Sequence, residues 1–312
     1  PVLHAVQRIG YGWMAFLFWT FCAGLLVDAC RIGRRLIPAA RRPPPFGPRG
    51  RLAVVLLTAS LAFAWGLAEG RSVRVRTVTV PGLAASRPLR LALVTDLHLS
   101  PVGNRAAASR ALALLEAAEP DLILSGGDLV DAPPEAVAAD LARLRALDPP
   151  LGKYAVLGNH EYYVGLEAAQ AAHAAAGFRL LRETRVPLLP GLILAGVDDR
   201  DGGRVGAECR ADEEAALPEA GTDACVILLK HRPTVSPTAE RRADLQLSGH
   251  THGGQIFPFH GLVRLLFPRL QGLHRVSDRL HLYVSRGAGT WGPPLRLGAR
   301  PEIVLLTIPG PG

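Results

Sequence analysis

The sequence predicts an α/β fold that follows two membrane-spanning helices. From residue 73 onward, short apolar runs of β type alternate with helical runs, which is the pattern of a layered α/β domain. Two apolar runs without a charged residue precede this part, at about residues 9–27 and 52–68, and each is just long enough to cross a bilayer. We therefore expect a membrane region over residues 1–72 and one large domain over residues 73–312.

Each element of the α/β part is expected from its length, apolar content and flanking turn residues. Strands are expected at residues 89–95, 121–125 and 153–157, and near residues 192–197, 225–230, 245–247, 281–285 and 302–308. Helices are expected at about residues 105–118 and 134–147. No internal repeat interrupts this alternation, so one domain accounts for all of these elements.

The two apolar runs are interpreted as membrane spans, and the alternative is a pair of buried core helices. A core helix rarely lacks a polar face over its whole length, which favours the spans. The stretch between the runs is rich in proline and arginine and is short enough for the positive-inside rule to apply. Its arginines are Arg31, Arg34, Arg35, Arg41, Arg42, Arg49 and Arg51. The rule places this stretch in the cytoplasm.

The orientation of the spans predicts the side of the membrane on which the large domain lies. If the arginine-rich stretch is cytoplasmic, the second span carries all later residues to the outer face. We therefore expect a multi-pass protein of the inner or plasma membrane whose large domain is extracytoplasmic. Arg71, Arg74 and Arg76 flank the second span on its other side and oppose this orientation.

The net charge gives no reason to expect a nucleic-acid partner. The chain has a formal net charge of +8, but residues 1–76 alone contain eleven arginines against only Asp28 and Glu69. The remaining residues contain 24 basic and 25 acidic side chains, so they create no field that attracts polyanions. The basic character therefore belongs to the membrane region.

The four cysteines carry little information about function. Cys22 and Cys30 lie in or beside the first apolar run, and Cys209 and Cys225 lie in the large domain without the spacing of a zinc site. The latter two either form a disulfide, if the domain is exported, or stay separate buried thiols.

Acidic and imidazole side chains directly follow the first two expected strands. Asp96 and His98 are two residues apart, so both side chains point to the same side and can chelate one cation. Asp128 and Asp131 follow the second strand, and the two glycines before Asp128 let the backbone approach a site closely. Because strand ends of an α/β sheet meet at one edge, we expect these side chains to converge.

Three later segments have the same arrangement. Asn159 and His160 follow the third expected strand, and His231 follows a later one. His250 and His252 project from a single loop after another strand. Each pattern taken singly is more often a turn or a core histidine than a ligand. Five of them at strand ends in one chain supply the carboxylate, amide and imidazole atoms that Mn, Fe or Zn prefer, so together they predict a metal centre.

In their order and spacing these motifs resemble the calcineurin-like metallophosphoesterase family. The matching patterns are Asp-x-His, Gly-Asp-x-x-Asp, Gly-Asn-His-Glu, an isolated His and Gly-His-x-His, and the resemblance covers about residues 89–308. Gly-His-Thr-His-Gly-Gly-Gln and the later Arg-Gly-Ala-Gly-Thr-Trp-Gly-Pro-Pro-Leu-Arg run are similar to the membrane-linked bacterial branch that includes the YkuE and YaeI phosphoesterases. The resemblance implies a layered sandwich of two mixed β-sheets flanked by helices.

The resemblance also implies a hydrolase of phosphoesters in which seven side chains hold two divalent ions, Mn, Fe or Zn. One ion would be bound by Asp96, His98, Asp128 and His252, and the other by Asp128, Asn159, His231 and His250. Asp128 would then bridge the two ions. A hydroxide shared by both ions would be the nucleophile.

His160 has no ligand role in the family pattern, so the resemblance assigns it to catalysis. It would face the leaving group, with Asp131 orienting the ring, and either donate a proton or stabilise the developing charge. No covalent intermediate is required, so Ser125 and Ser248 are interpreted as turn formers. The glycine-rich segments lack a Gly-Lys-Ser/Thr ending, which argues against a P-loop nucleotide site.

The sequence leaves several substrate classes open. The apolar stretch at residues 256–268 either docks on a lipid surface or belongs to the core. The family branch implies a lipid-linked or membrane phosphoester, such as a UDP-2,3-diacylglucosamine-like pyrophosphate or a phospholipid, with the bilayer as a partner. The alternatives are a broad phosphodiesterase or phosphomonoesterase acting on soluble substrates, and a non-catalytic membrane binding protein, which would normally have lost a ligand.

Overall fold

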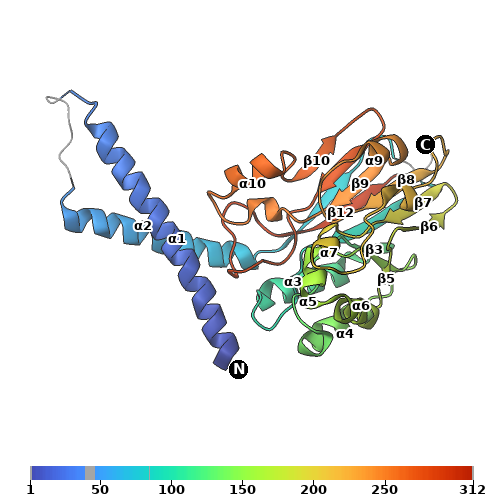
Figure 1. Cartoon of the computed structure of the whole chain (residues 1–312), viewed down its shortest axis with the longest axis horizontal. Coiled ribbons are helices and arrows are strands. Elements are labelled where there is room, and N and C mark those ends of the chain that lie inside the picture. The colour runs from blue at the N-terminus through green and yellow to red at the C-terminus, as the bar shows by residue number, and fades with distance from the viewer. Residues whose placement is uncertain (1, 39–45, 84, 311–312) are drawn as a thin grey trace.

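Two six-stranded β-sheets pack face to face with helices on their outer sides (Figure 1). The structure is a computed structural model that describes residues 2–38, 46–83 and 85–310. Each sheet contains both parallel and antiparallel neighbours, which confirms the predicted layered sandwich of two mixed sheets. Arg41 and Arg42 of the predicted cytoplasmic stretch lie outside the described residues.

The first sheet contains the strands that precede the predicted Asp96, Asp128 and Asn159 sites. Its strands, in spatial order, are β1 (Arg74–Thr79), β12 (Glu302–Ile308), β2 (Leu89–Val94), β3 (Leu122–Ser125), β4 (Lys153–Ala155) and β5 (Arg179–Leu180). β1 runs parallel to β12, and β12 runs antiparallel to β2. β2, β3, β4 and β5 are all parallel, so their carboxyl ends lie at one edge of the sheet.

The second sheet contains the strands that precede the predicted histidine ligands. Its strands, in spatial order, are β10 (Gly272–Arg275), β11 (His281–Val284), β9 (Leu245–Ser248), β8 (Cys225–Leu229), β7 (Leu192–Gly196) and β6 (Thr184–Leu189). β11, β9, β8 and β7 are parallel, and the two edge strands β10 and β6 are antiparallel to their neighbours.

Helices cover the outer face of each sheet. The first sheet is covered by α3 (Arg105–Ala118), α4 (Ala138–Ala146) and α6 (Leu166–Ala175), and the second by α8 (Glu213–Ala216) and α9 (Pro237–Arg242). The remaining short helices of the described ranges are η2 (Pro134–Val137), α5 (Asn159–Val164), α7 (Asp201–Arg204), η3 (His252–Gly254) and α10 (His260–Leu266). The helix expected at residues 134–147 is therefore η2 followed directly by α4.

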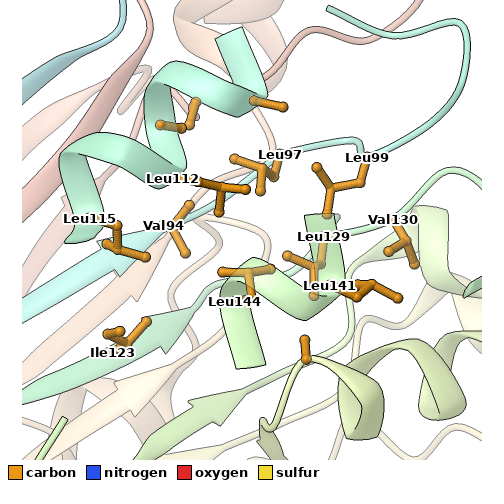
Figure 2. Packing of buried hydrophobic residues seen from close by; sticks show 14 of the residues in the cluster. Val94, Leu97, Leu99, Leu112, Leu115, Ile123, Leu129, Val130, Leu141 and Leu144 are labelled. Atoms are coloured by element: carbon orange, nitrogen blue, oxygen red, sulfur yellow. The ribbon is translucent and has the colours of Figure 1, made fainter. Parts of the chain in front are cut away.

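The central strands are buried on both faces. Successive side chains of a strand point to opposite sides, so β2 directs Leu91 and Leu93 toward the core between the sheets and Ala92 and Val94 toward the outer helices. Leu229 of β8 belongs to the core between the sheets. Figure 2 shows the outer layer, in which α3 and α4 cover the first sheet. This double burial holds the strand ends, and the side chains that follow them, in fixed positions.

Two long apolar helices precede the sheets. They are α1 (Val2–Arg34) and α2 (Pro48–Arg71), and each extends beyond the predicted run at both ends. Both are long and apolar enough to cross a membrane, and many of their large apolar side chains are exposed. The helices cross each other and project to one side of the sheets (Figure 1). This arrangement confirms the prediction of two apolar helices ahead of the α/β part.

Both apolar helices also pack directly on the α/β part. Trp19 of α1 is buried in a cluster with Leu295. The carbonyl of Gly66 in α2 accepts a hydrogen bond from the backbone N–H of Arg296 (3.0 Å). A Cβ atom on Gly70 would lie 3.0 Å from the Leu295 Cα, which is tighter than most Cβ contacts, so glycine favours this close approach of α2. The helices are therefore docked on the segment around Leu295 rather than linked to it only through the chain.

All four cysteines are free thiols in the described structure. The Cys209 thiol donates a hydrogen bond to the carbonyl of Asp199 (2.9 Å), and Cys225 begins β8. Of the two alternatives for Cys209 and Cys225, the structure supports separate thiols.

Candidate metal centre

Strands from both sheets end around one site, and the predicted ligands follow the carboxyl ends of these strands. Asp96 and His98 follow β2, Asp128 follows β3, Asn159 begins α5 after β4, His231 follows β8, and His250 and His252 follow β9. All are buried except His250, which is half-buried. We call these seven side chains the cage. The structure thus brings together residues that are up to 156 positions apart in the sequence.

One half of the cage consists of Asp96, His98 and His252, whose ligand atoms lie close enough together to hold one metal ion. The Nε2 atoms of His98 and His252 are 3.1 Å apart. The Nε2 atom of His252 is 3.6 Å from Asp96 Oδ1. These distances place two imidazole nitrogens and a carboxylate oxygen around one point.

The other half consists of Asp128, His231 and His250, which form a second group able to hold a metal ion. Asp128 Oδ2 is 3.2 Å from His231 Nε2, and His231 Nε2 is 3.2 Å from His250 Nδ1. Asp128 Oδ2 is also 3.8 Å from His98 Nε2 in the first half. Asp128 therefore lies between the two groups, in the position expected of a bridging carboxylate.

The donor atoms of the cage fit divalent cations. Asp96 Oδ2 and Asn159 Oδ1 are buried and have no hydrogen-bond partner among the residues that the structure describes. A buried polar oxygen without a partner is costly, and a bound cation removes that cost. Carboxylate, amide and imidazole donors without thiolates are the set that Mn, Fe and Zn accept.

The carboxylates and imidazoles of the cage shift one another's pKa values. Burial raises the pKa of the Asp96 carboxyl. Burial would also raise the pKa of Asp128, but His231 and His98 hold that pKa well below its ordinary value. Burial would lower the pKa of His231, but the carboxylates of Asp128 and Asp96 raise that pKa to about 10. The site therefore attracts positive charge strongly, whether as protons or as metal ions.

Five cage residues have left-handed backbone conformations. The φ angles are +53° at Asp96, +48° at His98, +54° at Asp128, +71° at His250 and +50° at His252. Such conformations cost roughly 1–3 kcal/mol each in residues other than glycine, and they persist only where the surroundings impose them. The fold therefore forces the backbone to turn these side chains inward.

Asp131 contacts two imidazoles at once. Its Oδ1 atom is 2.8 Å from His98 Nδ1 and 2.8 Å from His160 Nδ1. Burial would raise the pKa of Asp131, but the two rings lower it to about 2. The contact with Asp131 leaves His98 Nε2 directed at the cage, as is usual for a metal-binding histidine held by a carboxylate. His160 also lies within reach of His98 and Asp128.

Glu161 is a structural residue of the site to which the sequence reasoning gave no role. Its carboxylate is fully buried and accepts hydrogen bonds from the backbone N–H groups of Asp128 (2.9 Å), Leu129 (2.7 Å) and Gly158 (2.7 Å). These bonds join the turn after β3 to the start of α5. The signal in the sequence was the acidic residue two positions after Asn159, in the first turn of the helix.

Arg296 is a second residue whose role the sequence reasoning missed. Its guanidinium is fully buried and donates to the carbonyls of His252 (3.2 Å), Gly287 (3.3 Å) and Gly289 (2.9 Å). The N–H of Gly289 in turn donates to the carbonyl of Asp96 (2.8 Å). Arg296 therefore ties together the loops that carry Asp96 and His252. Burial and the adjacent Arg296 also hold the pKa of His252 well below its ordinary value, so its ring is neutral.

The site occupies the part of the chain that matches a known family model. The model of the calcineurin-like phosphoesterases matches residues 89–254, which is just over half of the chain. The chain belongs to this family. It is therefore a metal-dependent phosphoester hydrolase, and the predicted family, fold and enzyme class are confirmed.

Several relatives of this calcineurin-like phosphoesterase match most of its length. An uncharacterised metallophosphoesterase of Aquifex aeolicus is 40% identical over 76% of this chain and 91% of its own. A zebrafish transmembrane protein with a metallophosphoesterase domain is 30% identical over 95% of this chain and 71% of its own. The uncharacterised metallophosphoesterase YkuE of Bacillus subtilis is 32% identical over 69% of this chain and 77% of its own. The individual ligand and catalytic roles stay predictions.

Glu161→Gln is expected to weaken metal binding as well as stability. The amide presents an NH₂ group where the carboxylate now accepts hydrogen bonds, and buried N–H groups left without acceptors cost about 1–3 kcal/mol each. Thermal unfolding should therefore begin at a lower temperature, and the metal content after dialysis should fall. Glu167→Gln, at an exposed position in α6, is the matched control and should change neither quantity. A Glu161→Gln protein with wild-type metal content would show that Glu161 does not hold the cage.

Proposed function

We propose that the chain hydrolyses a lipid-linked or membrane phosphoester with the help of two divalent cations. The observation that carries the proposal is a cavity of about 560 Å³ that is lined both by cage residues and by apolar side chains. Asp128, Asn159 and His250 line it together with Val263 and Phe267. This volume is in the range of small-molecule sites, roughly 300–1,000 Å³. A phosphoryl group attached to hydrocarbon suits such a lining.

We assign the two cations to the cage as the family pattern implies. One would be held by Asp96, His98, Asp128 and His252, and the other by Asp128, Asn159, His231 and His250. Two divalent ions bound in this way lower the pKa of a water molecule and neutralise charge on the phosphoryl oxygens. Mn, Fe and Zn all suit the donor set, and the supply of metal decides among them.

We assign proton transfer to the leaving group to His160. Its ring lines the cavity, and its Nδ1 atom lies 2.8 Å from Asp131 Oδ1, which suits an Nδ1–H directed at that carboxylate. His160 Nε2 is then the atom that holds the transferable proton. Asp131 stays ionised because its pKa is about 2, so it keeps the ring oriented and stabilises its positive charge.

The surroundings of the cavity support an amphiphilic substrate. Phe257, Leu262 and Leu265 are 60%, 59% and 79% exposed, so much of the apolar stretch at residues 256–268 lies on the surface. Exposed apolar groups at this density are typical of a surface that contacts another molecule or a membrane. This exposure supports the lipid-docking alternative for the stretch over the core alternative.

We further propose that the α/β part lies on the extracytoplasmic face of the inner or plasma membrane. The arginines from Arg31 to Arg51, which lie in the last turn of α1, in the connecting stretch and in the first turn of α2, support this orientation through the positive-inside rule. A phospholipid or another phosphoester of the cell envelope then suits the location better than a cytoplasmic nucleotide-linked lipid.

The orientation is tested with reporters fused after residue 312. Alkaline phosphatase, which is active only outside the cytoplasm, is expected to be active, and green fluorescent protein exported in the same way is expected to be dark. The opposite pair of results would place the catalytic part in the cytoplasm and favour the nucleotide-linked lipid as substrate.

The substrate class is tested on the full chain in detergent micelles with Mn²⁺. We expect the value of kcat/KM for a phospholipid or UDP-2,3-diacylglucosamine to exceed that for cyclic nucleotides at least ten-fold, because only the lipids use the apolar lining. Chelation should abolish hydrolysis of bis(p-nitrophenyl) phosphate, and added Mn²⁺ should restore it. Faster hydrolysis of the cyclic nucleotides would support the soluble-substrate alternative instead.

His160→Ala is expected to lower kcat by about 10²–10⁴, the usual contribution of general acid catalysis, while the metal content stays at the wild-type level. His281→Ala is the control, because His281 begins β11 and pairs with the amino end of β9, opposite to the end that leads to the cage. Normal turnover would show that His160 does not transfer the proton. Loss of metal would instead make His160 a ligand.

A further inference from the structure

We propose that helix α1 is one wall of the substrate site, and that the space between α1 and α10 holds the hydrocarbon chain of the phosphoester. This inference rests on the proposed hydrolysis of a lipid-linked phosphoester, and it adds α1 to the residues that bind the substrate. The occupant is an acyl or alkyl chain whose phosphoryl end lies at the cage.

One cavity joins the cage to α1. Asp128 and His250 of the cage line it, and so do Met14, Ala15 and Phe18. The positions 14, 15 and 18 lie on one face of a helix, because residues four apart are neighbours on the helix surface. A hydrocarbon chain that lies along this face of α1 can be covalently linked to a phosphoryl group that is bound at the cage.

Helix α10 and the residue after it supply other walls of the same cavity. Val263 and Leu266 of α10 and the following Phe267 line it. The Phe267 ring is 5.1 Å from the imidazole of His250. The apolar lining therefore begins beside a cage residue, which favours hydrocarbon over a polar group next to the phosphoryl group.

Specific contacts hold α1 against the α10 region. The ring of Phe18 stacks on that of Phe259, with centroids 4.8 Å apart. Trp19 Nε1 donates a hydrogen bond to the carbonyl of Phe257 (3.0 Å). These contacts join residues more than 230 positions apart in the sequence. Helix α1 is therefore a structural part of the site rather than only a tether.

The outer surfaces of both walls are suited to lipid. Trp13 and Phe21 of α1 and Leu262 of α10 are each more than half exposed. Helix α1 is also long and apolar enough to cross a membrane. A hydrocarbon chain can therefore pass from the bilayer into the cavity without entering water. This path favours a lipid substrate over a second protein helix as the occupant of the cavity.

The test compares two phosphodiesters that release p-nitrophenolate by cleavage of the same P–O bond. Their second ester group is methyl in one and hexadecyl in the other. The full chain is assayed in non-ionic detergent micelles with Mn²⁺. Met14→Trp on the α1 wall and Val263→Trp on the α10 wall each place an indole ring in the cavity. In these variants, the kcat/KM of the hexadecyl ester divided by that of the methyl ester should fall at least ten-fold. The reason is that each methylene group moved from the cavity into water weakens binding by a factor of about four.

Leu17→Trp and Arg264→Trp are the matched controls. Both residues lie on the same two helices, are exposed and are outside the cavity lining. Both controls should keep the wild-type ratio of kcat/KM values. Partition of the hexadecyl ester into micelles does not bias this comparison, because it affects the assays of all variants equally. Phe18→Ala provides a third variant if the indole variants fail to fold, and it should lower the ratio because the ring contact is lost.

The outcomes separate this inference from the proposed function. Unchanged ratios in the wall variants, with the methyl ester still cleaved, would overturn the role of α1 and leave the hydrolase function standing. An equal fall in the controls would overturn that role as well. If the wild-type chain cleaves neither ester, the proposed function is wrong and the inference fails with it.

Discussion

The burial of two carboxylates side by side is the constraint on which the rest of the structure depends. Asp96 and Asp128 are 0% and 2% exposed, and charges in such an interior are stable only when positive charge and hydrogen bonds surround them. The chain provides imidazoles from both sheets and backbone turns in strained conformations. The backbone N–H groups of His250 and His160 also donate hydrogen bonds to Asp96 Oδ1 and Asp128 Oδ1, respectively (both 2.9 Å). The cations proposed for these carboxylates would offset these costs and would couple the metal centre to the stability of the fold.

Neither sheet forms the site alone. The first sheet supplies both carboxylates, the second supplies His231, His250 and His252, and the apolar core between the sheets sets the distance between these groups. Helix α2 docks on the backbone of Arg296, whose side chain holds the loops of the cage. Helix α2 therefore contributes to the geometry of the site.

The strands and site residues that follow from local sequence pattern were predictable, whereas the roles that depend on tertiary contacts were not. The central strands were predictable because both of their faces are buried, whereas β1, a largely exposed edge strand, has no such signal. The convergence of the seven cage residues was predictable because each follows a strand end. The roles of Glu161 and Arg296 were not, because their partners are backbone groups of distant loops. The place of α1 beside the cavity likewise depends on contacts across most of the chain.

The most direct test of this account is anomalous X-ray diffraction from crystals of the full chain grown with Mn²⁺, recorded at the manganese absorption edge. The account predicts two strong anomalous peaks per chain, both within coordinating distance of Asp128. A map with no peak at the cage, or with a single peak that Asp128 does not touch, would contradict the claim that paired cations neutralise the buried carboxylates.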